Sequence, residues 1–264
     1  MYPIIPFLDT VSTYQIMALI GVLTTGFYCV RVSKRLKYDD TDTIVFLLFT
    51  SIGIMIGGGL LFALTNFSGI IFVLNNLHLV NSWDTFVYVL QAIFGGSVFY
   101  GGLLGALSVA AIYLRRKPER KYLVDLATPG IPLFHFFGRI GCFLGGCCYG
   151  IPSPFGFTFT NSLVIEANGI RRFPVSLLEA SFNMGLFIFL SHCFNKGKYK
   201  DKLLYVYLGL YATGRFFIEF LRGDAVRGIW LFLSTSQIIS LAILTFILIK
   251  YIRYRSLELK SSNP

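Results

Sequence analysis

Apolar stretches alternate with short polar breaks along the whole chain. Each stretch is about 20 residues long, the length that a helix needs to cross a hydrocarbon core of roughly 30 Å. We therefore predict an all-α integral membrane protein. About seven transmembrane helices are expected, at residues 13–30, 43–64, 89–114, 124–147, 175–194, 203–221 and 229–251. Because no fixed-period repeat interrupts the pattern, residues 1–264 are expected to form a single polytopic membrane domain.

The polar breaks predict the orientation in the membrane. Four of them, at 31–37, 115–121, 196–202 and 250–260, hold 17 of the 23 Lys and Arg residues. Lys and Arg on short loops mark the cytoplasmic side. Since these breaks follow the first, third, fifth and seventh predicted helices, the N-terminus is expected outside and the C-terminus in the cytoplasm.

The opposite side carries two longer segments, at 65–88 and 149–174. The first contains Trp83 but no Lys or Arg, and the second contains three prolines. Tryptophan prefers the boundary between membrane and water. We expect both segments to be extracytoplasmic elements lying at the membrane interface.

The composition excludes a soluble globular protein. Apolar residues make up 55% of the chain and its mean hydropathy is +0.68, both far above the values of soluble domains. The net charge of +10 would fit a nucleic-acid-binding protein if it were clustered on one surface. It lies in the breaks instead, as in a membrane protein that faces anionic lipid, so no nucleic-acid partner is expected.

Ionisable residues within the apolar stretches are candidates for function, because each costs about 2.5 to 3.5 kcal/mol to insert. His135 and Arg139 are four residues apart and share a helix face. An arginine beside backbone exposed by glycines is suited to clamp a phosphate. The alternative is an arginine that extends to the headgroups among small packing residues. The glycines near this arginine are Gly138, Gly141, Gly145, Gly146 and Gly150.

The later helices supply more charge. Arg215 and Glu219 are spaced to form a pair that neutralises itself, but Arg222 and Asp224 follow closely and enlarge the group beyond what a structural pair needs. Glu179, in the fifth predicted helix, is expected to be a counter-ion of Arg139 or Arg215.

Two further positions have structural interpretations. The glycine-rich segment 95–105 is typical of close helix packing, with Tyr100 as a packing residue. Asp125 is expected to cap the fourth predicted helix from the cytoplasmic side.

Three cysteines, Cys142, Cys147 and Cys148, invite a metal or redox interpretation. Their C-x4-C-C spacing matches no common zinc pattern, so we expect no metal. A disulfide from Cys142 to one of the other two remains open, and small apolar packing residues are the default interpretation.

Together these segments resemble the prolipoprotein diacylglyceryl transferase family. Residues 138–143, with later glycines, resemble the family signature of glycine, arginine, an apolar residue, glycine, asparagine and phenylalanine. Other segments follow in the family's order: Tyr14 to Gly21, 95–105, Asp125 and Pro129, Pro174 to Glu179, Arg215 to Arg222, and Ser236 to Ser240. Three positions depart from it, since the family's asparagine is Cys142, its glutamate is Cys147 and its histidine is Tyr100.

The resemblance implies an enzyme of the bacterial cell membrane. It would transfer the diacylglyceryl group of phosphatidylglycerol to the cysteine thiol of a prolipoprotein lipobox and release glycerol phosphate, without a cofactor. Arg139 and Arg215 would clamp the phosphate, with Glu219 orienting them. Either His135, or Tyr100 together with Glu179, would act as the base. The implied substrate-binding residues are Tyr14, Gly138, Gly141, Gly146, Gly150, Glu179 and Arg222.

Two alternatives remain. A divergent transferase could use the same lipid with another acceptor, such as a surface glycan, which the replaced histidine and asparagine would fit. A non-enzymatic lipid-binding or transport protein would keep the arginines and need no base. Release of glycerol phosphate separates enzyme from binder.

Overall fold

The computed structural model describes residues 3–5, 8–65, 99–162, 164–224, 229–230 and 232–262, with isolated positions between 70 and 89. The described chain is mostly helical, as predicted. It forms two compact units, one of residues 1–32 with 124–264 and one of residues 33–123. Among the residues that the structure describes, four helices are long and apolar enough to cross a membrane, at Thr13–Arg35, Asp40–Leu64, Val175–Asn195 and Thr235–Ser256.

The unit of residues 33–123 is built on the helix pair α2 (Asp40–Thr65) and α5 (Phe99–Arg116), followed by the short helix η2 (Pro118–Arg120). Glycines bring the two backbones together. A Cβ on Gly57 would overlap the carbonyl oxygen of Gly101, and one on Gly53 would lie 2.7 Å from that of Gly105. This confirms the packing role predicted for the later part of the glycine-rich segment. Its earlier residues, 95–98, lie outside the described residues.

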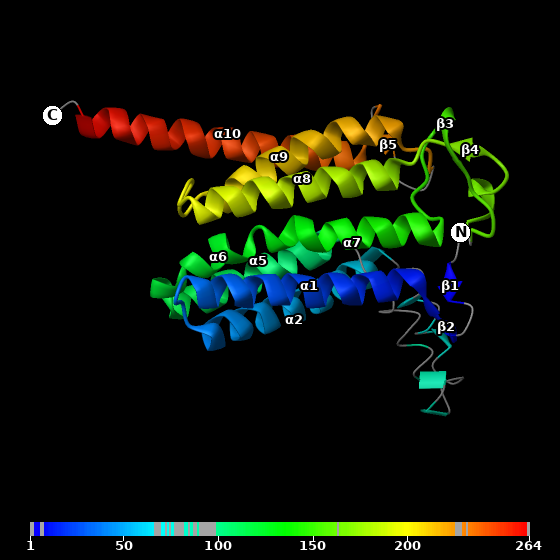
Figure 1. The fold of residues 1–264 in the computed structure, drawn as a ribbon, viewed down its shortest axis with the longest axis horizontal. Helices are drawn as coiled ribbons and strands as arrows, with labels where there is room; N and C mark the ends of the chain where they lie inside the picture. Colours follow the sequence, from blue (N-terminus) through cyan, green and yellow to red (C-terminus); the bar gives the residue numbers. More distant parts are fainter. Residues whose placement is uncertain are drawn as a thin grey trace. The chain divides into compact units, whose positions relative to one another are not determined.

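The other unit holds the helices α1 (Thr13–Arg35), α6 (Tyr122–Ala127), α7 (Gly130–Gly145), α8 (Val175–Asn195), α9 (Leu203–Ile218) and α10 (Thr235–Ser262), with α1 and α6 each continuing beyond it by a few residues. Helices α7, α8, α9 and α10 pack in chain order, with roughly aligned axes and each running opposite to the one before it (Figure 1). Between α8 and α9 lies an apolar core of Leu186, Leu190, Cys193, Leu203 and Tyr207. Two short 3-10 helices, η3 (Ile165–Ala167) and η4 (Glu219–Leu221), complete the unit.

The fourth predicted helix, 124–147, is interrupted. Helix α6 ends at Ala127 and α7 begins at Gly130, because Pro129 has no N–H to donate and disfavours a helical residue before it. Asp125 was predicted to cap its own helix, and it does not. Its carboxylate accepts hydrogen bonds from the backbone N–H groups of Asp201 (2.5 Å) and Leu203 (3.3 Å), and so caps the start of α9.

Two helices begin with the same capping motif, Ser-x-x-Gln. The Ser12 hydroxyl accepts from the N–H of Gln15, whose side chain accepts from the N–H of Ser12, at 3.2 and 2.9 Å. Ser234 and Gln237 make the same reciprocal pair at the start of α10, at 3.3 and 2.9 Å. The last predicted helix therefore starts later than residue 229.

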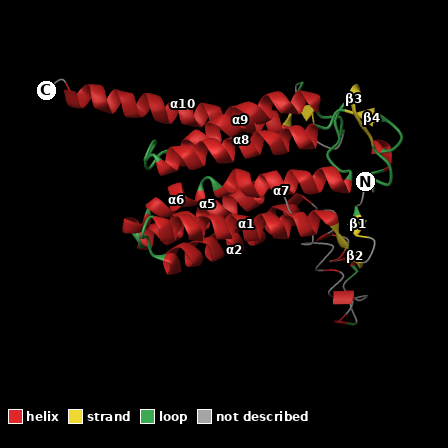
Figure 2. Ribbon diagram, viewed as in Figure 1, coloured by secondary structure: helices red, strands yellow, loops and turns green. Residues whose placement is uncertain are grey.

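The described strands of this unit form three antiparallel pairs near one end of its helices (Figure 2). They are β1 (Ile4–Ile5) with β2 (Leu8–Ser12), β3 (Pro152–Thr158) with β4 (Arg171–Arg172), and β5 (Ile229–Trp230) with β6 (Leu233–Ser234). The β3–β4 pair lies within the segment 149–174 that was predicted to lie between helices. Most of the other such segment, 65–88, lies outside the described residues.

Candidate functional site

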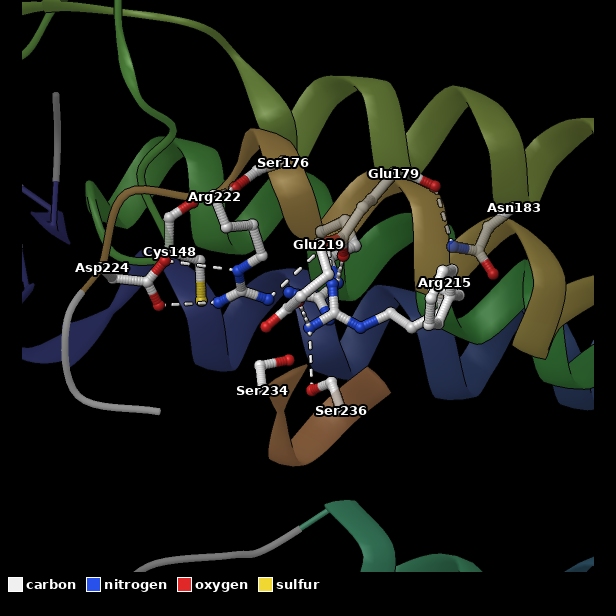
Figure 3. Close-up of polar contacts among 12 residues, drawn as sticks. Cys148, Ser176, Glu179, Asn183, Arg215, Glu219, Arg222, Asp224, Ser234 and Ser236 are labelled. Carbon is white, nitrogen blue, oxygen red and sulfur yellow. Dashed lines mark hydrogen bonds and ion pairs between the residues drawn. The ribbon is translucent and has the colours of Figure 1, made fainter. Parts of the chain in front are cut away.

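The buried carboxylate of Glu179, in the first turns of α8, is surrounded by guanidinium groups (Figure 3). Its Oε2 atom lies 2.5 Å from Nε of Arg139, and its Oε1 atom lies 2.5 Å from Nη1 of Arg215. Nη1 of Arg222 lies 3.6 Å from Oε1. Glu179 was predicted to be a counter-ion of Arg139 or Arg215, and it pairs with both.

Arg215 joins α8 to α9 and to the start of α10. Its Nη2 atom lies 2.6 Å from the carboxylate of Glu219, one helical turn further along the chain, as the spacing predicted. The same nitrogen donates to the hydroxyl of Ser236 at 3.2 Å. The planar guanidinium therefore bridges two buried carboxylates.

Arg222 follows η4 and is held by Asp224, to which it donates two hydrogen bonds of 2.8 and 3.3 Å. Burial acts to lower the pKa of the Arg222 guanidinium, but the hydrogen bonds to Asp224, together with the nearby charges of Glu179 and Asp224, outweigh it and raise that pKa, so Arg222 stays charged. We call these three arginines and three carboxylates the Glu179 cluster; its members are Arg139, Glu179, Arg215, Glu219, Arg222 and Asp224.

The backbone around Gly150 positions Arg222. Gly150 forms an antiparallel bridge with Arg222, flanked by hydrogen bonds of 3.0 Å from Ile151 N to Leu221 O and from Gly223 N to Tyr149 O. A Cβ on Gly150 would overlap the carbonyl oxygen of Phe173. Gly150 is thus required for a close approach of three chain segments, a positioning role.

Gly146 ends α7 in the left-handed conformation, at φ 75°. A Cβ there would also lie 2.7 Å from the Ser162 side chain, whose hydroxyl donates to the Gly146 carbonyl at 2.9 Å. By contrast, a Cβ on Gly138 would meet nothing within 4 Å. Of these predicted binding glycines, Gly138 has open space beside it.

Tyr14, in the first turn of α1, packs on α7. A Cβ on Gly141 would lie 3.2 Å from Cα and Cδ2 of Tyr14, so this glycine lets the two helices meet. The Tyr14 hydroxyl interacts electrostatically with Arg139 and with the nearby cysteines. The structure therefore brings Tyr14 to the same end of α7 as the Glu179 cluster.

His135 lies one turn before Arg139 on α7, among polar residues of α8 and α9. Its Nδ1 atom is 3.5 Å from the hydroxyl of Tyr207, and its ring centroid is 5.5 Å from that of Tyr211. Asn183, which donates to the Glu179 carbonyl at 2.8 Å, also interacts with His135. A buried polar chain therefore leads from His135 to the helix turn that carries Glu179.

Sequence reasoning named all six residues of the Glu179 cluster but assigned no contact to two serines beside it, Ser176 and Ser236. Ser236 contacts Arg215, and Ser176 donates to the Cys148 carbonyl at 2.9 Å. Ser236 lies one turn before a second serine that faces the same way, a weak signal that spacing alone would not distinguish from packing. Tyr100 is the second residue of α5, and its side chain lies outside the described part of the structure.

Comparison with known proteins decides the family. The family model described as prolipoprotein diacylglyceryl transferase matches residues 4–253. The chain belongs to this family. Phosphatidylglycerol–prolipoprotein diacylglyceryl transferase 2 of Clostridium perfringens is 33% identical over 241 residues, which cover 89% of this chain and 87% of that protein.

Two further family members are similar over most of their length. The phosphatidylglycerol–prolipoprotein diacylglyceryl transferase of Clostridium tetani is 33% identical, over 86% of this chain and 87% of that protein. The protein of the same name from Dehalococcoides mccartyi is 30% identical, over 80% of this chain and 78% of that protein. The resemblance found in the signature segment therefore extends over most of the chain.

Proposed function

We propose that this family member transfers the diacylglyceryl group of phosphatidylglycerol to the cysteine thiol of a prolipoprotein and releases glycerol phosphate. The names of its relatives support this donor and acceptor. The observation that carries the proposal is the pairing of one buried carboxylate, Glu179, with the arginines of three different chain segments. Such a site holds guanidinium groups ready for a phosphate in a low-dielectric setting.

Arg139 is the arginine to which we assign the phosphate. Its side chain is 22% exposed, whereas those of Arg215 and Arg222 are 8% and 6% exposed. It contacts Glu179 through Nε and also forms a side-chain hydrogen bond with Tyr211. Arg215 and Arg222 then position Glu179, and Glu219 orients Arg215, since each makes its main contacts within the cluster.

The chemistry makes and breaks one bond at the glycerol carbon. The sulfur of the acceptor cysteine forms a bond to this carbon, the carbon–oxygen bond to phosphate breaks, and glycerol phosphate leaves with its charge held by Arg139. The thiol proton passes to a base. We assign the base to His135, because both carboxylate oxygens of Glu179 contact guanidinium groups and are engaged in positioning.

The base assignment has its own test. His135→Gln removes the proton acceptor and should abolish thiol modification, while binding of phosphatidylglycerol vesicles stays within about twofold of the original. Tyr100→Phe is the matched comparison. If Tyr100→Phe abolishes transfer and His135→Gln does not, the base is Tyr100.

We further propose seven membrane passes, with the N-terminus outside, in a bacterial cell membrane. Two basic breaks support a common side: Lys250 donates to the hydroxyl of Tyr205 at 2.9 Å, and Lys202 lies 4.3 Å from the ring centroid of Tyr254. The loop between α8 and α9 therefore lies beside the basic tail. Labelling of an introduced cysteine, Lys198→Cys, from either side of the membrane tests this orientation. The cysteine at position 198 is expected to react only from the cytoplasm.

The function is tested with purified protein in phosphatidylglycerol vesicles and a lipobox peptide, followed by mass spectrometry. The expected product is the peptide heavier by one diacylglyceryl group, absent when its cysteine is serine. Arg139→Ala should abolish it, and Arg171→Ala, at an exposed arginine of β4, should not. Glycerol phosphate without modified peptide would indicate another acceptor, and no release would indicate a lipid-binding protein.

A further inference from the structure

Three cysteines meet where α7 ends. Cys142 lies in the last turn of α7, and Cys147 and Cys148 follow the left-handed residue Gly146, which turns the chain back. Their sulfur atoms all lie within 4.8 Å of one another. Cys142 is buried and the other two are half-buried, so the group is enclosed without being sealed. We call these three residues the thiol cluster; the function proposed above does not use it.

We propose that the thiol cluster is a binding site for one thiophilic d10 cation, Cu⁺ or Zn²⁺. Zinc–thiolate bonds are about 2.3 Å long, so an ion bound to three sulfurs would hold them roughly 3.7 to 4.0 Å apart. Sulfurs that already lie within 4.8 Å of one another reach this geometry by small side-chain movements. Thiolates are soft ligands that select Cu⁺ and Zn²⁺ over Mg²⁺, Ca²⁺ and Mn²⁺.

The ligand set limits the coordination. Among the residues that the structure describes, no His, Asp or Glu joins the three cysteines as a fourth ligand. Zinc in proteins is usually four-coordinate, so Zn²⁺ would take water in the open position. Cu⁺ is satisfied by thiolates alone. Either ion would therefore have three sulfur ligands. A fourth ligand, water, is expected for Zn²⁺ and not for Cu⁺.

The charge around the cluster favours the bound form. Each thiol loses its proton to solvent as its metal–sulfur bond forms, so three protons leave and the three-thiolate centre carries negative charge with either ion. The Arg222 guanidinium lies beside Cys148 (Figure 3), and Arg139 also interacts with it electrostatically. These arginines offset the charge of the centre in a low-dielectric setting.

A bound ion would brace the segment that positions Arg222. Cys148 is joined to α8 through Ser176, and the next residues, Tyr149 and Gly150, pair with the chain around Arg222. Linking Cys142 to Cys148 through a metal fixes this segment to α7. Binding of the ion should therefore raise the unfolding temperature, whatever the acceptor of the transferase reaction.

The test uses the full chain, purified in detergent, reduced with a phosphine and freed of metal. Zn²⁺ and Cu⁺ are titrated separately against a chelator of known affinity, and X-ray absorption reports the ligands. One ion per chain, three sulfur ligands at about 2.3 Å, and a rise in unfolding temperature are expected for at least one of the two ions. Cys147→Ser should weaken binding by more than about tenfold, since even outer-shell changes cost that much.

Cys29→Ser and Cys193→Ser are the matched controls, because both cysteines are buried elsewhere in the same unit. They should leave the affinity unchanged. Cys148→Ala is a second variant in case Cys147→Ser fails to fold. The proposal is overturned if neither ion binds stoichiometrically or if the bound ion has no sulfur ligands. It is also overturned if Cys147→Ser and Cys148→Ala both bind the ion as tightly as the original protein, or if protein isolated from cells contains a Cys142–Cys147 disulfide.

Discussion

The Glu179 cluster and the α2–α5 pair join helices in opposite ways. Between α2 and α5 the contact depends on missing side chains, since glycines let two backbones touch. In the Glu179 cluster it depends on long charged side chains that meet in a buried space. A glycine contact is local and tolerates no added atom. A charged cluster reaches across several segments and tolerates no missing partner.

The two kinds of contact also differ in what a single substitution costs in free energy. An added Cβ at a glycine contact separates two helices that otherwise keep their hydrogen bonds. A removed carboxylate leaves guanidinium groups buried without a counter-charge, which costs several kcal/mol. The Glu179 cluster is therefore expected to lose function and stability together, and the glycine pair mainly stability.

The largest effect is expected for Glu179→Gln. This change keeps the shape of the side chain but removes the carboxylate that contacts three arginines. The folded state should lose about 3–5 kcal/mol, measured by chemical unfolding in detergent. Peptide modification should fall by at least about a hundredfold.

Glu166→Gln serves as its control, because Glu166 is exposed in η3. It should change neither stability nor turnover. Wild-type stability and turnover in Glu179→Gln would mean that the arginines are neutralised by other groups, and the cluster would lose its assigned centre.

Arg215→Lys keeps the positive charge and tests whether the cluster needs the planar guanidinium. An ammonium group is a point charge and cannot reproduce the planar fork that contacts Glu179 and Glu219 through different nitrogens. The variant should lose about 1.5–3 kcal/mol of stability, the range for a hydrogen bond to a charged group. Equal stability of Arg215→Lys and the original protein in chemical unfolding would show that charge alone suffices.

Gly57→Ala tests the other side of the comparison. Its Cβ would overlap the Gly101 carbonyl oxygen, so the helices must separate, at a cost of about 1–3 kcal/mol. Gly26→Ala is the matched control, since a Cβ there meets nothing within 4 Å and alanine favours helix. Thermal unfolding should separate the two variants, with Gly57→Ala lower. The idea of a close backbone contact fails if both unfold at the same temperature.

Sequence reasoning succeeded where the determining distance lies within one helix. The spacing of Arg215 and Glu219 predicted their pair, and helix periodicity placed His135 and Arg139 on one face. Glu179 was expected to pair with one arginine or another. That it pairs with both depends on how α7, α8 and α9 approach one another, which no spacing encodes.

The break in the fourth predicted helix and the thiol cluster depend on backbone turns, which a hydropathy pattern does not reveal. The Thr-Pro-Gly sequence around Pro129 divides the fourth predicted helix, although the apolar stretch continues across it. The thiol cluster arises because Gly146 and Cys148 both adopt positive φ and reverse the chain toward Cys142. Its C-x4-C-C spacing predicted no metal, since the known patterns assume other turns.

The smallest effect is expected at Asp125, a buried carboxylate that is satisfied by backbone instead of arginine. It accepts hydrogen bonds from the N–H groups of Asp201 and Leu203 where α9 begins. Asp125→Ala should cost about 1 kcal/mol, as for other helix caps, and Asp125→Asn should cost less, since it keeps one of the two acceptor oxygens. Chemical unfolding of both variants measures the difference. If Asp125→Asn costs as much as Asp125→Ala, one acceptor oxygen cannot replace two, and this end of α9 needs the whole carboxylate, as the Glu179 cluster does.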